Sequence, residues 1–272
     1  MTSAGSLPVK WPAEAIWEAV SPLLPGFTVE ILPQIDSTNT ELMRRARAGQ
    51  LDCVLLVAER QTAGRGRLGR DWHSDLQSQG STLTFSLGLA LAPVDWSGLS
   101  LAVGLSLAQT LHPALKLKWP NDIWLAGRKL AGILIETASV PGASIAANGS
   151  ADRYVVIGIG INIVAPPADG LRTAPAGLRE VLPGVQAHDV LEHLMVPLVQ
   201  AVQRFAVQGF APLVAAYGVR DLLNGCEVVC SDGLTGVASG VDASGALLVH
   251  TDQGMKKITS AEVSVRPAGT PL

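Results

Sequence analysis

The sequence has few cysteines and little net charge. Its 272 residues include three cysteines, and 20 Lys and Arg residues stand against 23 Asp and Glu. Cys53 lies far from Cys226 and Cys230, so the cysteines predict no disulfide framework and fit a reducing cytosol. A net charge of -3 and an isoelectric point near 5.9 argue against a sequence-independent nucleic-acid coat, which normally has an isoelectric point above about 9.

Long apolar runs are also missing. No window reaches the roughly 18 uninterrupted apolar residues that a membrane-spanning helix needs, and the longest candidate, 99–111, contains two serines, a glutamine and a threonine. Residues 1–10 lack the basic and then apolar regions of a secretory signal. We therefore expect a cytoplasmic protein with no membrane partner. At about 150 residues per domain, the chain is long enough for one large domain and a small appendage.

The apolar patterns predict helices and strands in alternation up to Gly218, followed by short strands only. Helices are expected over 13–20, 40–49, 98–111, 188–208 and 210–217, and strands over 53–58, 82–89, 116–119, 131–136 and 154–163. Beyond Gly218, five short strands separated by Asp-Gly, Ser-Gly and Gln-Gly turns predict a small barrel. The pattern favours a leader over 1–29, a larger α+β unit over 30–218 and the barrel over 222–268.

Arginine and glycine are concentrated in residues 60–70, directly after a strand of buried type. Four of the arginines and three glycines fall within these eleven residues. Glycine lets the backbone approach a ligand, and the planar guanidinium group suits phosphate and carboxylate oxygens. We therefore predict an anion-binding loop, which repulsion between like charges should leave mobile in the absence of the anion. The alternative is a solvated basic loop.

This loop contains the pattern Gly-x-Gly-x-x-Gly, yet we do not expect a dinucleotide-binding fold. That fold needs a helix start with small residues after the third glycine, whereas Arg70-Asp71-Trp72-His73 follows here. No Gly-Lys pair occurs in the chain, which excludes a Walker-type phosphate loop, and no Gly-x-Ser-x-Gly supports hydrolase chemistry. His188 and His193 are five residues apart, which does not match a helical metal motif. A bound nucleotide would then have to be held by arginines.

A second polar cluster is Lys118-Trp119-Pro120-Asn121-Asp122. Proline biases the preceding Trp119 towards an extended conformation, and Asn121-Asp122 predicts a turn. Lys118, Asn121 and Asp122 would then project from one strand end. Such a group suits a metal–nucleotide ligand, and it suits equally a hairpin with a surface ion pair.

Two further segments combine strands with glycine. Lys129 precedes an apolar strand, with Gly132 where the backbone would meet a ligand; the alternative is a lysine whose stem simply lies along the strand end. In Gly158-Ile159-Gly160-Ile161-Asn162, the glycines would make room for a ligand beside the amide of Asn162.

Together with Asp36-Ser37-Thr38-Asn39, these segments resemble biotin protein ligases in their order and spacing. The resemblance runs from about residue 33 to 266 and includes an SH3-like C-terminal barrel. It implies a class II aminoacyl-tRNA synthetase-like catalytic domain, with a mixed sheet and flanking helices. The chain departs from the family at Leu68, where many members have another arginine. Its first thirty residues are too short for the winged-helix domain of some members, so we expect neither repressor activity nor a DNA partner.

The resemblance also implies roles for individual residues. Arg67, Lys129 and Asp122 would be catalytic, and Asp122 would also contact Mg²⁺. Biotin would be bound by Ser37, Thr38, Asn39, Gln61, Gly64, Arg65, Gly66, Arg67, Lys129, Gly132, Ile133 and Asn162. ATP would be bound by Arg65, Arg67, Arg70, Trp72, Lys118, Asn121, Asp122, Lys129 and Asn162.

The activity that the resemblance implies is ATP-dependent biotinylation. Biotin would be converted to biotinyl-5′-adenylate and then transferred to a lysine of the biotin carboxyl carrier protein of acetyl-CoA carboxylase or another biotin-dependent carboxylase, with Mg²⁺ accompanying ATP. The rivals are a lipoate ligase, which shares the fold and the adenylation chemistry, and a non-catalytic nucleotide-binding module. The sequence leaves a homodimer open.

Overall fold

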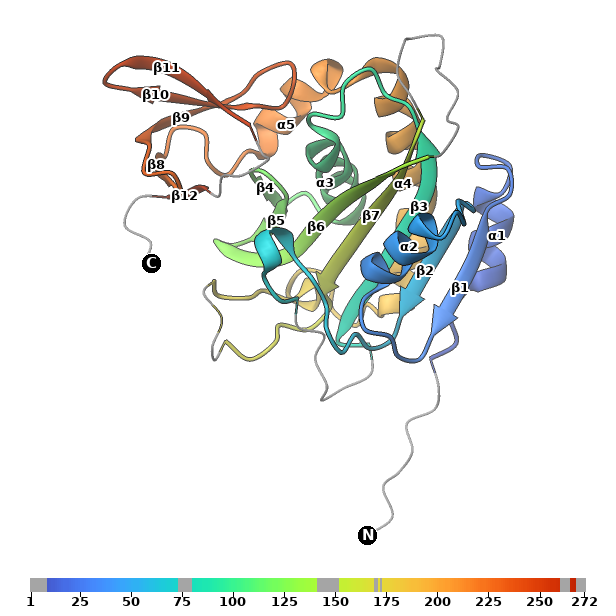
Figure 1. Cartoon of the computed structure of the whole chain (residues 1–272). Helices are drawn as coiled ribbons and strands as arrows, with labels where there is room; N and C mark the ends of the chain where they lie inside the picture. Colours follow the sequence, from blue (N-terminus) through green and yellow to red (C-terminus); the bar gives the residue numbers. More distant parts are fainter. Residues whose placement is uncertain are drawn as a thin grey trace.

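Two β-sheets organise the part of the chain that the computed structural model describes, which is residues 9–72, 80–140, 152–168, 171, 173–259 and 265–267. The larger sheet has seven strands in the order β1-β2-β3-β7-β6-β5-β4, and helices cover both of its faces (Figure 1). The smaller sheet has five strands in the order β11-β10-β9-β8-β12. The mixed sheet with flanking helices and the separate C-terminal sheet agree with the fold expected from the sequence.

The large sheet is antiparallel except at one edge, where β1 pairs in parallel with β2. Its strands are β1 Thr28–Leu32, β2 Val54–Ala58, β3 Thr82–Leu91, β4 Lys116–Lys118, β5 Asp122–Leu125, β6 Arg128–Ser139 and β7 Arg153–Asn162. Strands β2, β3 and β7 are buried along almost their whole length. Burial on both faces explains why they read as continuous apolar runs.

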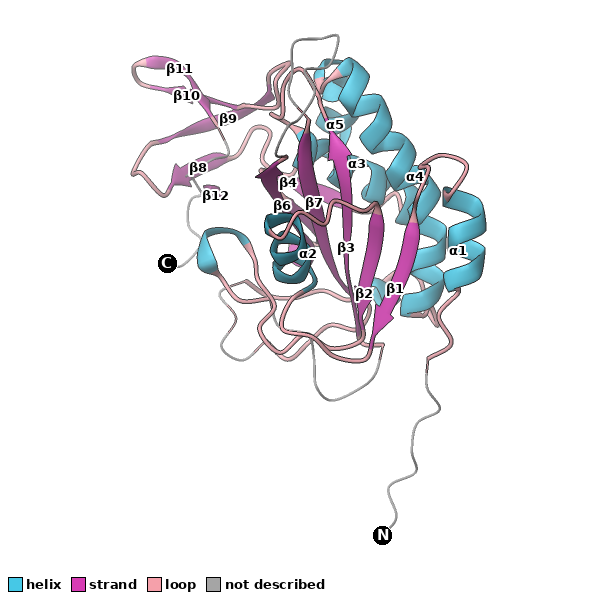
Figure 2. Ribbon diagram, turned by 45° about the vertical axis from the view of Figure 1, so that its right-hand side comes forward, coloured by secondary structure: helices cyan, strands magenta, loops and turns pink. Residues whose placement is uncertain are grey.

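The helices divide between the two faces of this sheet (Figure 2). They are α1 Ala13–Val20, α2 Thr38–Arg47, α3 Leu99–Leu111, α4 Ala187–Gln208 and α5 Val214–Arg220, and single 3₁₀ turns lie at Arg67–Gly69, Leu178–Glu180 and Ala211–Leu213. Helices α3 and α4 pack on each other and on one face, where the main core forms. Helix α2 covers part of the opposite face, with Leu42 and Met43 packed on β2 and β7. None of the helices in the described ranges is both long and apolar enough to cross a membrane.

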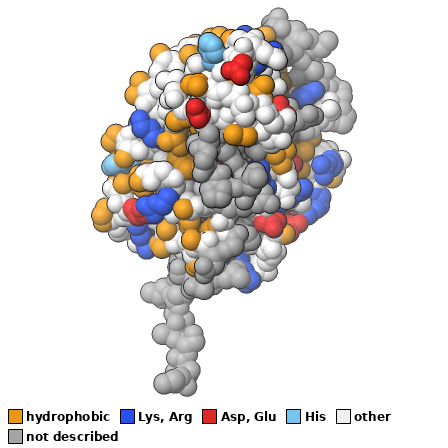
Figure 3. Space-filling model, turned by 90° about the vertical axis from the view of Figure 1, so that its left-hand side faces the viewer, with side chains coloured by type: hydrophobic (Ala, Val, Ile, Leu, Met, Phe, Trp, Pro, Cys, Tyr) orange, Lys and Arg blue, Asp and Glu red, His pale blue; other side chains and the backbone are white. Residues whose placement is uncertain are grey.

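The small sheet is attached to the β4–β5 hairpin of the large one. Its strands are β8 Glu227–Cys230, β9 Thr235–Val241, β10 Leu247–Thr251, β11 Gly254–Ile258 and β12 Val265–Pro267. The indole of Trp119 donates a hydrogen bond to the carbonyl oxygen of Gly245 (3.0 Å), and the N–H of Leu222 donates to that of Leu117 (2.9 Å). On the molecular face in Figure 3, basic and acidic side chains are interspersed.

Three expectations about local structure need correction. Helix α2 begins at Thr38 with Ser37 as its N-cap, so Thr38 and Asn39 lie inside the helix that was expected to begin at residue 40. Asp122 opens strand β5 opposite Lys118 and does not lie in a turn. Strand β1 was not expected, and it contains the position of the expected boundary between leader and larger unit at residues 29 and 30.

Candidate active site

The candidate site lies on the sheet face that α2 partly covers. Pairing across the strands places Asp122, Gly132, Gly160 and Thr84 in one row. The next row on this face contains Leu134, Gly158 and Ser86, because alternate residues of a strand share a face. Because glycine and small polar residues project little from the middle of this face, segments outside the sheet can approach its backbone.

The start of α2 supplies buried polar groups to this face. Ser37 caps the helix by accepting a hydrogen bond from the N–H of Thr40 (3.4 Å). The N–H of Thr38 donates to Oε1 of Gln61 (2.7 Å), and Thr38 Oγ1 lies 3.2 Å from the same oxygen. Ser37, Thr38, Asn39 and Gln61 are all buried. The structure therefore brings together these four residues, which the sequence resemblance assigned to biotin.

Two members of this group were missed from the sequence. Ser86 Oγ, on β3, lies 2.7 Å from Thr38 Oγ1 and 2.6 Å from Asn39 Oδ1. Asn39 Nδ2 donates to Oε2 of Glu136 on β6 (3.0 Å) and to the carbonyl oxygen of Leu134 (3.3 Å). A serine within the buried run of β3 and a carboxylate at the end of the apolar run 131–135 were signals that could have indicated both residues. We call Gln61, Thr38, Ser86, Asn39 and Glu136 the polar network.

Gly158 makes the close packing of this network possible. A Cβ atom at Gly158 would lie 1.9 Å from Asn39 Oδ1. From the sequence, we expected this glycine to make room for a ligand. In the structure it makes room for Asn39, which belongs to the polar network.

The arginine-rich loop folds into a short hairpin. The N–H of Gly66 donates to the carbonyl oxygen of Arg70 (2.7 Å), and that of Trp72 donates to Gly64 (2.9 Å). A Cβ atom at Gly64 would lie 2.4 Å from the carbonyl oxygen of Trp72, so a side chain there would prevent this contact. Leu68 has a positive φ of 58°, and its side chain is 54% exposed. The arginines of this hairpin differ in their exposure to solvent.

Arg67 is directed towards β5, whereas Arg65 and Arg70 are exposed. Its Nη1 donates to Oδ1 of Asn121 (3.3 Å). Burial lowers the pKa of the Arg67 guanidinium from its ordinary value, the Asp122 carboxylate raises it, and Arg70 lowers it further. Of the three loop arginines expected to contact ATP, the structure brings Arg67 to the other candidate residues.

Asn121 and Asp122 are held by β6. The side-chain amide of Asn121 donates to the carbonyl oxygen of Ile133 (2.8 Å), and the N–H of Ile133 donates back to that of Asn121 (3.0 Å). Lys129 Nζ forms an ion pair with Asp122 (2.8 Å). The backbone of Lys129 is bonded on both sides, since its N–H donates to Ala174 and its carbonyl accepts from Ala176. These contacts fix a cation and a carboxylate side by side.

Trp72 packs on the glycines of β6 and β7. Cβ atoms at Gly160 and Gly132 would lie 2.3 Å and 3.5 Å from the indole ring, and Lys129 Nζ lies 5.9 Å from a ring centroid. The indole nitrogen is buried and has no hydrogen-bond partner among the described residues. Trp72, at the end of the hairpin, therefore covers the part of the sheet that contains Gly132 and Gly160.

The other expected residues are distributed as follows. Lys118 shares the site face, because it pairs with Asp122 in the β4–β5 hairpin. Asn162 is buried at the end of β7, in the register position opposite Thr82. The side chain of Ile133 is on the opposite face, in the main core, so only its backbone reaches Asn121.

The charges and polar groups of this face divide into two ends. One end consists of buried hydroxyls and amides, with the Glu136 carboxylate behind Asn39, and these groups suit a neutral polar group that both donates and accepts hydrogen bonds. The other end carries Arg67 and Lys129, which suit carboxylate or phosphate oxygens. No group of three or more potential metal ligands occurs within the described ranges. The arrangement can bind a molecule with a neutral polar head and an anionic tail.

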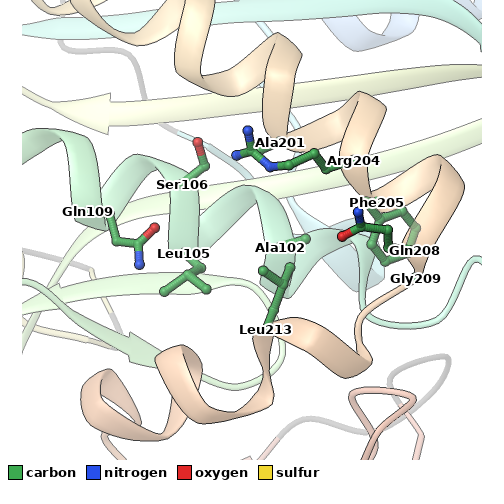
Figure 4. Close-up of a pocket in the computed structure, with 10 residues that line it drawn as sticks. All are labelled: Ala102, Leu105, Ser106, Gln109, Ala201, Arg204, Phe205, Gln208, Gly209 and Leu213. Atoms are coloured by element: carbon green, nitrogen blue, oxygen red, sulfur yellow. The ribbon is translucent and has the colours of Figure 1, made fainter.

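A separate pocket of about 50 Å³ lies between α3 and α4 (Figure 4). Its lining includes Leu105 and Ser106 from α3 and Arg204 and Phe205 from α4. Sites that bury drug-sized ligands usually measure about 300–1,000 Å³. This pocket is also built from the helices on the other face of the sheet, so it is not part of the candidate site.

Comparison with family models places two matches on the chain. The model of the biotin/lipoate A/B protein ligase family matches residues 31–162, and that of the biotin protein ligase C-terminal domain matches residues 231–266. The first match includes the polar network, the arginine loop, Lys129 and Asp122. The second covers most of the small sheet.

Comparison with individual proteins gives matches along most of the chain. The chain is 33% identical to the biotin–[acetyl-CoA-carboxylase] ligase of Paracoccus denitrificans, over 86% of this chain and 98% of that one. It is 32% identical to the bifunctional ligase/repressor BirA of Escherichia coli, over 90% of this chain and 76% of the relative. Among solved structures, the biotin protein ligase from Aquifex aeolicus in complex with biotin and ATP superposes with a TM-score of 0.70 at 28% identity, over 88% of this chain and 99% of that one.

Proposed function

The chain belongs to the biotin protein ligase family, and on this premise we propose that it activates biotin with ATP and transfers it to a lysine of a biotin carboxyl carrier protein. The observation that carries the proposal is the two-ended site on one sheet face, with the hydroxyl and amide groups of the polar network at one end and Arg67 and Lys129 at the other. Biotin has matching ends, a neutral ureido ring and a carboxylate.

In the proposed complex, the ureido ring lies against the start of α2. Ser37, Thr38 and Gln61 provide hydroxyl and amide groups that can pair with the ring N–H and C=O groups. Asn39 supports them from behind, because its amide is bonded to Glu136, Leu134 and Ser86. Because Ser37, Thr38 and Gln61 are buried, a bound ring would exchange hydrogen bonds to water for hydrogen bonds to fixed partners. The aliphatic chain of biotin would pass Gly132 and reach Lys129.

The first chemical step forms biotinyl-5′-adenylate. A carboxylate oxygen of biotin attacks the α-phosphorus of ATP, a new P–O bond forms, and the bond to the leaving pyrophosphate breaks. Negative charge rests on the phosphate oxygens throughout, so fixed cations supply most of the electrostatic help. We assign this role to Arg67 and Lys129, with Arg65, Arg70, Lys118 and Asn162 as further contacts.

The second step transfers the biotinyl group. The lysine amine of the carrier protein attacks the acyl carbon, an amide bond forms, the bond to AMP breaks, and the amine proton leaves to solvent. Trp72 and the hairpin 64–70 keep water away from the adenylate between the steps, which suppresses its hydrolysis. The packing of Trp72 on Gly160 and Gly132 supports this role: the indole already lies along the proposed path of biotin, and it would move away from these glycines to cover the bound ligand.

Asp122 is the carboxylate that we propose for contact with Mg²⁺. Magnesium is usually held by one or two carboxylates together with substrate phosphates, and Asp122 faces the cations of the site. It fits this pattern as a single ligand, with Asn121 beside it. When bound, the ion would help to neutralise the charge of the phosphates.

We also propose a division of labour between the two sheets. The larger unit, expected over residues 30–218 and here including α1, would contain the whole chemical site, and residues 222–268 would form the SH3-like unit. The proposal requires neither a DNA partner nor a homodimer.

The test is an incubation of the full chain with ATP, Mg²⁺, labelled biotin and an isolated biotin carboxyl carrier domain. We expect covalent label on the acceptor and one pyrophosphate released per biotin transferred. Transfer of lipoate in place of biotin would indicate a lipoate ligase. Nucleotide binding with neither pyrophosphate release nor transfer would indicate a non-catalytic module, and either result would refute the proposal.

A further inference from the structure

Three short contacts of the polar network have only two hydroxyl hydrogens between them. Thr38 Oγ1 lies 3.2 Å from Gln61 Oε1 and 2.7 Å from Ser86 Oγ, and Ser86 Oγ lies 2.6 Å from Asn39 Oδ1. Thr38 and Ser86 each have one O–H hydrogen, and both amide oxygens only accept. One of the three contacts must therefore lack a hydrogen. This count holds only while Asn39 presents its oxygen to Ser86, because a turned-over amide would supply a third hydrogen.

Glu136 and the backbone carbonyl of Leu134 determine the orientation of the Asn39 amide together, and Glu136 is the closer of the two acceptors. An ionised carboxylate accepts hydrogen bonds and donates none, and the carbonyl oxygen of Leu134 beside it also only accepts. Asn39 must therefore present its NH₂ group to both, at 3.0 Å and 3.3 Å. Its oxygen then faces Ser86, and the hydrogen of Ser86 is committed to Asn39.

The direction of the remaining bonds follows from this commitment. Ser86 has no further hydrogen, so its 2.7 Å contact with Thr38 is a hydrogen bond only if Thr38 donates. We infer that Thr38 does so, because this contact is shorter than its 3.2 Å contact with Gln61. The contact without a hydrogen is then Thr38 Oγ1 to Gln61 Oε1, which at 3.2 Å is the longest of the three. Gln61 Oε1 is still satisfied, because it accepts from the backbone N–H of Thr38 at 2.7 Å.

We propose that Glu136 is a positioning residue that acts through Asn39 and Ser86 to hold the hydroxyl of Thr38 as a hydrogen-bond acceptor for a ring N–H of biotin. With its hydrogen donated to Ser86, the oxygen of Thr38 keeps its lone pairs for the ligand. This inference rests on the proposed function, because it takes biotin to be the ligand. It also gives the site a basis for preferring a ureido ring to a dithiolane, which has no N–H group.

Burial of the polar network strengthens the preference for a ureido ring over a dithiolane. Thr38, Asn39 and Ser86 are 3%, 3% and 0% exposed, so water has little access to replace a missing partner. A ligand without an N–H group would leave the oxygen of Thr38 unpaired in a buried place, which is costly. The position of Gly158 against Asn39 Oδ1 keeps the asparagine in place beneath the helix.

The first test is Glu136→Gln, which changes hydrogen-bonding capacity but hardly changes volume. The new side chain can either accept from Asn39, as the carboxylate does, or donate to it. When it donates, the Asn39 amide turns over at the expense of its 3.3 Å bond to the Leu134 carbonyl, Asn39 donates to Ser86, and Ser86 donates to Thr38. The hydroxyl of Thr38 then donates to Gln61 and is no longer held as an open acceptor. We expect the KM for biotin to rise roughly tenfold, the effect of losing one good hydrogen bond, while kcat and the KM for ATP stay within about twofold. The assay is biotin-dependent pyrophosphate release by the full chain.

A matched control is Glu41→Gln on the outer side of α2. Glu41 pairs with Arg44 and Arg45 and does not touch the network, so all three constants should stay at their wild-type values. If both variants raise the KM for biotin equally, loss of negative charge near α2 is the cause and the proposal is wrong.

A swap provides the sharper test. Asn39→Asp places two carboxylates together and should raise the KM for biotin further. Adding Glu136→Gln restores one donor, because the amide introduced on β6 can donate to the carboxylate introduced on α2, while the other oxygen of that carboxylate accepts from Ser86. We expect the double variant to have a lower KM than Asn39→Asp alone. If the KM of the double variant rises by the product of the two single-variant increases, the proposed direction of the hydrogen bonds is wrong.

A second ligand provides an independent test in case the Asn39→Asp variant does not fold. The probe is 5-(thiolan-2-yl)pentanoic acid, which has the ring sulfur and the carboxylate of biotin but no ureido group. Glu136→Gln should reduce the preference for biotin over this probe roughly tenfold, and an unchanged preference would overturn the inference alone. If the wild-type chain releases no pyrophosphate with biotin, the proposed function itself fails.

Discussion

The polar network and the arginine hairpin lie on the same sheet face, but they are built in opposite ways. Thr38, Asn39 and Ser86 are buried, and their partners come from β3, β6 and the segment after β2. In the hairpin, Arg65 and Arg70 are exposed, and backbone hydrogen bonds within 64–72 maintain its shape. The polar network is therefore preorganised before a ligand binds, whereas the hairpin has exposed arginines that can move to contact an anion.

This difference suggests how one site can be both selective and reactive. A rigid, neutral pocket can discriminate between ligand head groups, since a wrong ligand leaves buried groups unpaired. A charged segment with few tertiary contacts can close on the anion and open for the acceptor protein. Substitutions that affect one region and leave the other intact test whether the two regions act separately.

The largest effect is expected for Lys129→Ala. This substitution removes a cation from the reacting end and leaves Asp122 without its ion-pair partner. We expect the rate of biotin-dependent pyrophosphate release to fall by about 10²–10³-fold, as for loss of one preorganised electrostatic group. Lys129→Arg should recover part of the rate. A Lys129→Ala variant with normal turnover would remove this lysine from the chemistry.

The next effect separates the two kinds of arginine in the hairpin. Arg67 reaches Asn121, whereas Arg70 is exposed. We expect Arg67→Ala to slow adenylation by roughly 10–100-fold and to let adenylate escape, and Arg70→Ala to have a clearly smaller effect. The measurements are single-turnover adenylate formation and trapping of released adenylate with hydroxylamine. Equal losses in both variants would mean that the hairpin changes its arrangement during catalysis.

Two glycines on β7 allow each region to be disturbed separately. In Gly158→Ala the new methyl group collides with Asn39, and in Gly160→Ala it collides with Trp72. We expect Gly158→Ala to weaken biotin binding about tenfold or more in calorimetry. Gly160→Ala should instead increase adenylate release, with a smaller change in biotin affinity. The reverse pattern would contradict the assignment of the two ends.

The smallest effect is expected from salt. Between about 0.05 and 0.5 M NaCl the screening length falls severalfold, which weakens contacts of exposed charges more than those of buried neutral groups. We expect the KM for ATP to rise a few-fold and the KM for biotin to change less. Steady-state kinetics at fixed pH would check this, and an equal response of both constants would argue against the division.

Local patterns were sufficient to predict most of the elements. The apolar runs of β2, β3 and β7 and the helical periodicity of α1, α3 and α4 appear near their expected bounds. Strand β1 was missed although residues 27–31 alternate between apolar and polar side chains; the strand is only five residues long, and none of them is buried. Asp122 was placed in a turn because Asn-Asp is a turn signal, but pairing with Lys118 and Gly132 extends it into β5. In that case, long-range pairing overrides local propensity.

The candidate site was predictable where residues of one role are adjacent in sequence. The arginine loop and Lys129 were predicted from their sequence neighbours, whereas Thr38 was predicted from the resemblance to biotin protein ligases. Ser86 and Glu136 were not, because their partner Asn39 lies 47 and 97 residues away, and a single sequence does not indicate that contact. The opposite facing of Arg67 and Arg70 also depends on the tertiary fold.

The most direct test of the central claim is a crystal structure of the full chain with biotinyl-5′-adenylate bound. We expect the ureido ring against Thr38 and Gln61, an N–H of the ring at hydrogen-bond distance from Thr38 Oγ1, and Arg67 and Lys129 beside the phosphate, with Trp72 over the ligand. An adenylate bound elsewhere, or residues 64–70 extended into solvent away from it, would contradict the account.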